Sequence, residues 1–77
     1  MNMYVGNLIY NMTEEELKNL FSPFGKVLSS RIITDHYTRQ SKNMGYVVMA
    51  VKEEGKTAVQ ALNGTKINDR RIIVRKA

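Results

Sequence analysis

Two tyrosines and the basic residues around them are the side chains in this sequence whose types and spacing could do chemistry. Tyr46 lies in the run Lys42-Asn43-Met44-Gly45-Tyr46-Val47-Val48-Met49, which begins polar and basic and becomes apolar. Successive side chains of a strand point to opposite faces, so Val47 suits a core when Tyr46 faces outward. Phosphates need positive charge and unstacked bases need a flat apolar surface. A ring beside Lys42 on an outer face is therefore typical of a surface for single-stranded nucleic acid.

The first residues of the chain supply a second ring in a similar pattern. Asn2-Met3-Tyr4-Val5-Gly6 alternates in the same way and predicts a strand with Met3 and Val5 inward and Tyr4 outward. Gly6-Asn7 ends this strand. A single exposed tyrosine is an ordinary strand residue. Two of them on one face of a sheet would form a surface for stacking bases.

The amino-acid composition restricts the kinds of function that this chain can have. The 77 residues include 12 Lys and Arg against 7 Asp and Glu, a net charge of +5, and the isoelectric point is about 9.8. This balance favours a polyanionic partner. The absence of cysteine excludes disulfides, thiolate metal sites and a thiol nucleophile. No apolar run approaches the ~18 residues of a membrane-spanning helix, so we expect one soluble domain over residues 1–77.

The acidic cluster near residue 14 has a structural explanation. Thr13 and Glu16 have the spacing of a capping box, and acidic residues suit the positive end of a helix dipole. Pro23 and Gly25 end the helix. Its apolar residues recur at i, i+3, i+4 and i+7: Leu17, Leu20, Phe21 and Phe24. We therefore expect these carboxylates to cap a helix and the phenylalanines to lie in the core.

A second strand is predicted over residues 27–34. The interruption at Leu28-Ser29-Ser30 indicates a bulge. If Ile32 points inward, Arg31 and Ile33 point to the same outer face as the tyrosines.

The polar segment over residues 35–41 predicts a hairpin loop to the third strand. Arg39 gives this loop positive charge. The single histidine, His36, has no second histidine with which to share a metal. Loop polarity therefore explains it.

The last third of the chain predicts a helix and a final strand. Lys52 to Gly55 opens the helix, which ends at Asn63-Gly64. Its expected apolar stripe consists of Ala58, Ala61 and Leu62. Lys66-Ile67 and a turn at Asn68-Asp69 then predict a short hairpin into a last strand over residues 71–75. In that strand Ile72 and Val74 share one face, and Arg71, Ile73 and Arg75 share the other.

The predicted element order is strand, helix, strand, strand, helix, strand. This order indicates an α+β chain with the ferredoxin-like βαββαβ arrangement, in which two helices cover one face of a four-stranded antiparallel sheet. The other face stays open. This fold serves many functions, so it does not by itself decide one.

Two motifs resemble those of the RNA-recognition-motif family. Met3 to Leu8 resembles its ribonucleoprotein hexamer, and Lys42 to Met49 resembles its octamer. The octamer match is partial, because Asn43 replaces a glycine and Met44 and Met49 replace aromatic residues. The resemblance continues through Leu20-Phe21-Ser22-Pro23-Phe24-Gly25, Ile32-Ile33-Thr34-Asp35 and Ala61-Leu62-Asn63-Gly64. Since Met1 directly precedes the first strand, the chain is similar to small single-domain bacterial members.

The resemblance implies a strand order of 4-1-3-2 and stacking of bases on the two tyrosines. The principal RNA-binding residues it implies, together with the charges, are Tyr4, Tyr46, Met44, Arg31, Lys42 and Arg75. A second group of expected contacts consists of Asn2, Asn7, Ile33, Arg39, Val48, Arg71, Ile73 and Lys76. Met44 offers no flat ring where the family commonly has one. Asn7 could cap the turn after the first strand or bond to a nucleotide, and both alternatives stay open.

The expected partner is single-stranded RNA, with single-stranded DNA as an alternative. We expect a monomeric, cytoplasmic post-transcriptional regulator, or a nuclear one if the source is eukaryotic. No catalytic residue, metal, cofactor, membrane or small-molecule substrate is predicted, because no Ser/His/Asp grouping or phosphate-cradling loop occurs. The competing hypothesis is a protein-interaction domain, since Ile33, Val48 and Ile73 make the outer face apolar.

Overall fold

The protein forms the predicted succession of strands and helices. The computed structural model describes residues 1–39 and 41–77. For residues 41 and 42 it describes the backbone but not the side chains. The main elements are β1 (Asn2–Gly6), α1 (Glu14–Phe21), β2 (Val27–Thr34), β3 (Ser41–Met49), α2 (Lys52–Leu62) and β6 (Ile73–Lys76). Three short ones join them: the 3-10 helix η1 (Ser22–Phe24), β4 (Lys66–Ile67) and β5 (Arg70–Arg71).

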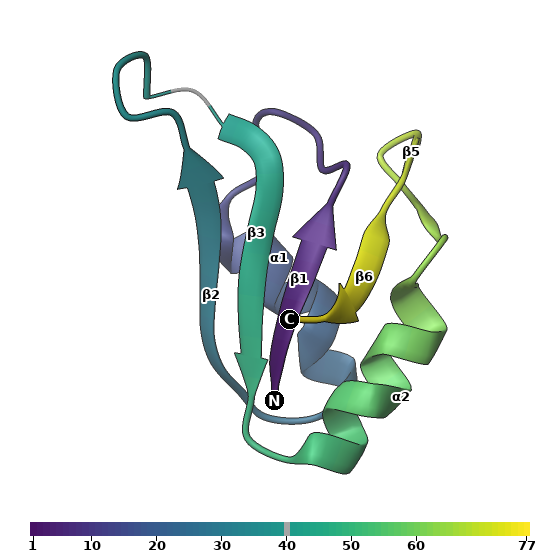
Figure 1. Cartoon of the computed structure of the whole chain (residues 1–77). Helices are drawn as coiled ribbons and strands as arrows, with labels where there is room; N and C mark the ends of the chain where they lie inside the picture. The colour runs from purple at the N-terminus through teal and green to yellow at the C-terminus, as the bar shows by residue number, and fades with distance from the viewer. Residues whose placement is uncertain (40) are drawn as a thin grey trace.

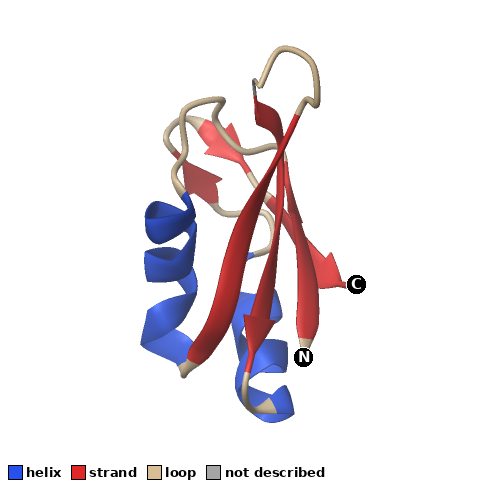
Figure 2. Cartoon of the chain, turned by 90° about the vertical axis from the view of Figure 1, so that its left-hand side faces the viewer, coloured by secondary structure: helices blue, strands red, loops and turns tan. Residues whose placement is uncertain are grey.

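Four strands form one antiparallel sheet in the order β2-β3-β1-β6 (Figure 1). Both helices lie on the same side of this sheet, and the other side is bare (Figure 2). The predicted fold class and strand order are therefore confirmed. A separate two-stranded sheet, β4-β5, precedes β6.

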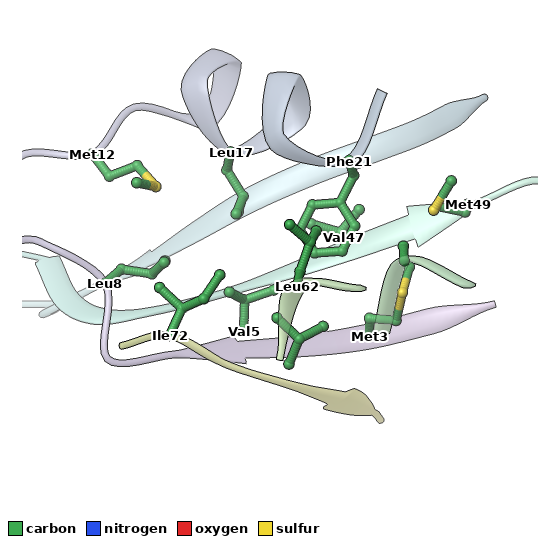
Figure 3. Close-up of a cluster of buried hydrophobic side chains, with 12 residues drawn as sticks. Met3, Val5, Leu8, Met12, Leu17, Phe21, Val47, Met49, Leu62 and Ile72 are labelled. Atoms are coloured by element: carbon green, nitrogen blue, oxygen red, sulfur yellow. The ribbon is translucent and has the colours of Figure 1, made fainter. Parts of the chain in front are cut away.

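The core lies between the sheet and the helices (Figure 3). Alternation along the strands places Met3, Val5, Val47 and Met49 on the covered face, where each side chain is fully buried. Phe21 from α1 packs against them as the largest of the fully buried side chains. No polar side chain is buried among the described residues. The predicted inward faces of β1 and β3 are thus confirmed.

The predicted capping box at the start of α1 is present. The Glu16 amide donates to Thr13 Oγ1 over 3.0 Å, and the Thr13 amide donates to Glu16 Oε1 over 3.0 Å. Glu14 has another structural role, because its carboxylate accepts a hydrogen bond from the Ile32 amide at 2.9 Å. Two of the three acidic residues therefore stabilise the fold, as the sequence indicates.

The bulge in β2 is also confirmed. The pairing of β2 with β3 shifts register between Val27 and Ser29. A second shift, between Ile33 and Thr34, was not predicted. It lies opposite Asn43, which adopts φ 62°, a left-handed conformation that asparagine tolerates better than most residues. This explains how Asn43 replaces the glycine of the family's octamer.

The predicted apolar stripe of α2 is wrong at Ala61, which is exposed. The side that faces the sheet instead carries Gly55, Ala58, Val59 and Leu62, at i, i+3, i+4 and i+7. A Cβ on Gly55 would lie 2.7 Å from Met1 Sδ, so the flexible Met1 side chain would have to shift. A glycine that looks like a weak helix start is thus part of the packed face.

The last predicted strand is divided into β5 and β6. Asn68 and Asp69 both have positive φ, 51° and 66°, as a type I′ hairpin turn requires. This confirms the turn but places Arg71 in β5 rather than in the main sheet. Its guanidinium donates to the Gly64 carbonyl at 3.0 Å. The prediction that Arg71 shares a face with Ile73 and Arg75 is therefore wrong.

Candidate nucleic-acid interface

One row of side chains crosses all four strands on the open face. Arg31 of β2 is directly opposite Tyr46 of β3, Tyr46 is opposite Tyr4 of β1, and Tyr4 is opposite Arg75 of β6. Neighbouring strands are about 4.8 Å apart. The two rings therefore lie together at the sheet centre with an arginine at each end. We call these four residues the tyrosine row.

Apolar residues flank the tyrosine row toward the loop end of the sheet. Register places Ile33, Met44, Gly6 and Ile73 in line there. Ile33, Met44 and Val48 are half-buried, but none belongs to the core or packs against it. Ile73 is 48% exposed. These side chains thus belong to the open face, where the sequence predicted them: Ile33, Met44, Val48 and Ile73.

The two tyrosines contact one another edge to face. Their ring centroids are 5.9 Å apart, with an interplanar angle of 66°. The hydroxyl end of the Tyr4 ring leans along β1 over Gly6, where an added Cβ would lie 2.6 Å from the hydroxyl oxygen. Gly6 therefore leaves the space that this ring occupies. Tyr46 is 41% exposed, and Tyr4 is half-buried.

The two arginines of the row have different surroundings. The Arg75 guanidinium lies over the Tyr4 ring, with Cζ 4.8 Å from the centroid, which is cation–π geometry. Arg31 is exposed, and no hydrogen bond, ion pair or ring contact of its guanidinium is found within the described part of the chain. Both charges are placed where they could meet a phosphate beside a stacked base.

The side chain of Asn7 bonds to a distant hairpin, a role that neither alternative from the sequence described. Its side-chain amide donates to the Arg71 carbonyl at 2.8 Å, and its carboxamide oxygen accepts a hydrogen bond from the Arg70 guanidinium. Arg70 Nε also donates to the Asn7 carbonyl at 3.1 Å. Asn7 thus joins the end of β1 to the β4-β5 hairpin. No sequence pattern indicated Arg70, because its partner is 63 positions away.

The remaining predicted contacts are scattered. Asn2 lies on the open face opposite Val48. Lys76 is paired with Met3, so alternation directs it away from the face that carries Arg75. Arg39 lies in the β2–β3 loop with φ 60°, away from the tyrosine row. Lys42 is among the predicted contacts, but its side chain lies outside the described residues.

The described residues hold no group of three or more His, Cys, Asp or Glu side chains that could bind a metal. None of their helices is long and apolar enough to cross a membrane. In the loop, the His36 and Tyr37 rings are arranged edge to face, with centroids 5.4 Å apart.

A sequence profile of the RNA recognition motif matches residues 3–73. The chain belongs to the RNA-recognition-motif family. Over 75 residues it is 37% identical to the chloroplastic 29 kDa ribonucleoprotein of Arabidopsis thaliana, covering 97% of this chain and 22% of that protein. The chain covers 46% of the glycine-rich RNA-binding protein blt801 of Hordeum vulgare and 31% of the chloroplastic 28 kDa ribonucleoprotein of Spinacia oleracea, so it spans less than half the length of these three relatives.

Solved structures place the fold in the same family. The crystal structure of RNA-binding protein PG1 is 39% identical and has a TM-score of 0.97, with 100% of this chain and 93% of that chain covered. The Rna15 RNA recognition motif with bound RNA (GU) is 28% identical with a TM-score of 0.87, covering 99% and 81%. Since the relatives include chloroplast proteins, a bacterial source and a cytoplasmic location stay predictions.

Proposed function

We propose that this RNA recognition motif binds short single-stranded RNA on its open face and carries out no chemistry of its own. The observation that supports this most is the tyrosine row, in which adjacent rings on the two central strands lie between two arginines. Bases would stack on Tyr4 and Tyr46, and phosphates would contact Arg31 and Arg75. The RNA-bound structure of the Rna15 motif supports the same use of this fold.

The expected affinity is modest. Stacking contributes about 1–3 kcal/mol per base, so two rings supply roughly 2–6 kcal/mol. The position that commonly carries a third ring holds Met44, which is apolar and adaptable but not flat. We therefore expect a dissociation constant near or above ~1 μM, equivalent to about −8 kcal/mol.

Alanine substitutions of the two rings test the proposal. We expect Tyr4→Ala and Tyr46→Ala each to weaken binding of a short labelled RNA, measured by fluorescence anisotropy. Tyr37→Ala is the matched control, because Tyr37 is 91% exposed in the β2–β3 loop and away from the row. If both row variants bind RNA as tightly as the wild type, binding does not use this face.

Salt dependence tests the phosphate contacts separately. Each phosphate neutralised on a single strand contributes roughly −0.7 to the slope of log affinity against log salt. With Lys42 and Arg71 as further contacts beside Arg31 and Arg75, three or four phosphates predict a slope of about −2 to −3. A slope near zero would contradict the roles given to Arg31 and Arg75.

A protein partner is the second candidate function. The exposed Ile73 and the half-buried Ile33 and Val48 favour it, since they leave apolar surface on both sides of the row. NMR chemical-shift mapping with RNA oligomers separates the two candidates. Perturbed amides in β1 and β3 support RNA binding, and their absence favours the protein partner. The regulatory role and the monomeric state stay predictions.

A further inference from the structure

The two stacking positions of the tyrosine row differ in the free protein. At one end the Arg75 guanidinium lies over the Tyr4 ring, with Cζ 4.8 Å from the centroid. At the other end Arg31 makes no such contact with Tyr46 within the described residues, and Tyr46 is the more exposed ring at 41%. A base can therefore reach Tyr46 directly, whereas an arginine already occupies the position beside Tyr4.

The position of the Tyr4 ring makes this guanidinium an obstacle. The ring leans along the sheet with its hydroxyl end over Gly6, and the Tyr46 ring borders it at 66°. A stacking base needs an uncovered ring face. Arg75 is directly opposite Tyr4 on β6, and its guanidinium lies over a face of this ring. The guanidinium and the base would compete for the same place.

We propose that Arg75 is a gate on the Tyr4 stacking position, which opens when a phosphate of the ligand draws the guanidinium off the ring. This inference rests on the proposed function. Arginine binds phosphate through charge-assisted, often bidentate hydrogen bonds, and on opening these take the place of the cation–π interaction with Tyr4. The Tyr4 position therefore selects a base attached to an anionic backbone, and Tyr46 accepts any base.

The size of the effect follows from the strength of the cation–π interaction. At an exposed site such an interaction corresponds to roughly a two- to fivefold change in an equilibrium constant. A ligand without backbone charge must displace the guanidinium and forms no phosphate hydrogen bond in return. For such a ligand the wild type should bind roughly two- to fivefold more weakly than a variant without the guanidinium.

The test compares RNA with an uncharged methylphosphonate oligomer of the same base sequence. Both are titrated by NMR, which measures millimolar as well as micromolar dissociation constants. We expect Arg75→Ala to bind the uncharged oligomer roughly two- to fivefold more tightly than the wild type. We expect it to bind RNA more weakly, with a salt slope smaller by about 0.7 because the variant neutralises one phosphate fewer.

Arg31→Ala is the matched control, because it removes one charge from the same row and no ring interaction. It should weaken RNA binding and reduce the slope in the same way, and it should leave affinity for the uncharged oligomer unchanged. A second readout uses the free protein. The Arg75 side-chain proton signals should be shifted by the Tyr4 ring current, and Tyr4→Ala or added RNA should remove that shift.

Three outcomes would overturn the gate. Unchanged affinity of Arg75→Ala for the uncharged oligomer would make Arg75 an ordinary phosphate ligand. Weaker affinity would mean that the guanidinium stacks on the base itself. Absence of the ring-current shift in the free protein would mean that Arg75 does not occupy the ring. A wild type that binds no RNA would instead contradict the proposed function, and with it the gate.

Discussion

The two faces of the sheet use the same strands under different constraints, and two glycines show how. On the covered face, a Cβ on Gly45 would collide with the backbone carbonyl of Arg31 and lie 3.0 Å from Leu17 Cδ2. On the open face, the atoms nearest to a Cβ on Gly6 would belong to the far end of the Tyr4 side chain. Space on the covered face is fixed by backbone and core. Space on the open face is set by side chains that can move.

This difference predicts that substitutions on the covered face change stability and that those on the open face change affinity. The largest effect is expected for Phe21→Ala. Phe21 is fully buried, and its removal should lower the free energy of unfolding by about 3–5 kcal/mol. Urea denaturation followed by circular dichroism measures this change. Tyr46→Ala, which also removes a ring, is the control and should keep most of the stability.

Equal losses of stability from Phe21→Ala and Tyr46→Ala would contradict this difference between the two faces. Weaker RNA binding by Phe21→Ala, under conditions where the variant is fully folded, would contradict it as well. In that case the two faces would be coupled through the sheet.

The glycine pair gives the next largest effect. Gly45→Ala should lower the free energy of unfolding by about 1–3 kcal/mol, because β2 and β3 must move apart. Gly6→Ala should change it by no more than about 1 kcal/mol and should weaken RNA binding by displacing the Tyr4 ring. Thermal melts and RNA titrations of both variants measure these effects. A larger stability decrease for Gly6→Ala would show that movement of the Tyr4 ring does not relieve the clash with the added Cβ.

A smaller effect is expected at the helix cap, which lies outside both faces. Thr13→Ala removes the oxygen that accepts the Glu16 amide, so it should cost about 1 kcal/mol of stability. A melting temperature lowered by roughly 4–8 °C corresponds to that change. RNA affinity should be unchanged at a temperature where the variant is folded. A change in affinity would mean that α1 contributes to the interface.

Local patterns in the sequence predicted much of the fold. Alternation placed Met3 and Val5 inward and Tyr4 outward, since a strand has only two faces. The capping box at Thr13 needed only residues three positions apart. The bulge near Ser29 was visible because the polar run interrupts an apolar pattern. These features depend on neighbours along the chain, so the sequence contains them.

The features that the sequence did not reveal depend on distant residues. Arg71 leaves the sheet because a two-residue turn pairs it with Lys66, and alternation alone does not reveal where a strand is divided. The anchoring of Asn7 by Arg70 joins residues 63 positions apart. The interaction between Arg75 and Tyr4 required the register of β6 against β1. The sequence predicted which side chains lie on the open face. It did not predict which of them contact one another across the strands.

The smallest expected effect tests whether the open face lacks a third ring. Met44 is next to Tyr46 along that face and opposite Gly6, and it is half-buried. Met44→Phe would add a flat surface there. Because the thioether already supplies apolar surface, we expect a gain of about 1 kcal/mol in RNA binding, roughly fivefold in Kd. Stability should change by less than about 1.5 kcal/mol.

Val48→Phe is the control for added apolar surface, because Val48 lies on the other side of the tyrosine row, opposite Asn2. A gain confined to Met44→Phe would show that bases follow the line from Tyr46 toward the β2–β3 loop. Equal gains would show that any ring on the face strengthens binding. No gain from Met44→Phe, with Tyr4 and Tyr46 still required, would mean that the bound RNA ends at the tyrosine row. The open face would then hold two stacked bases and no third.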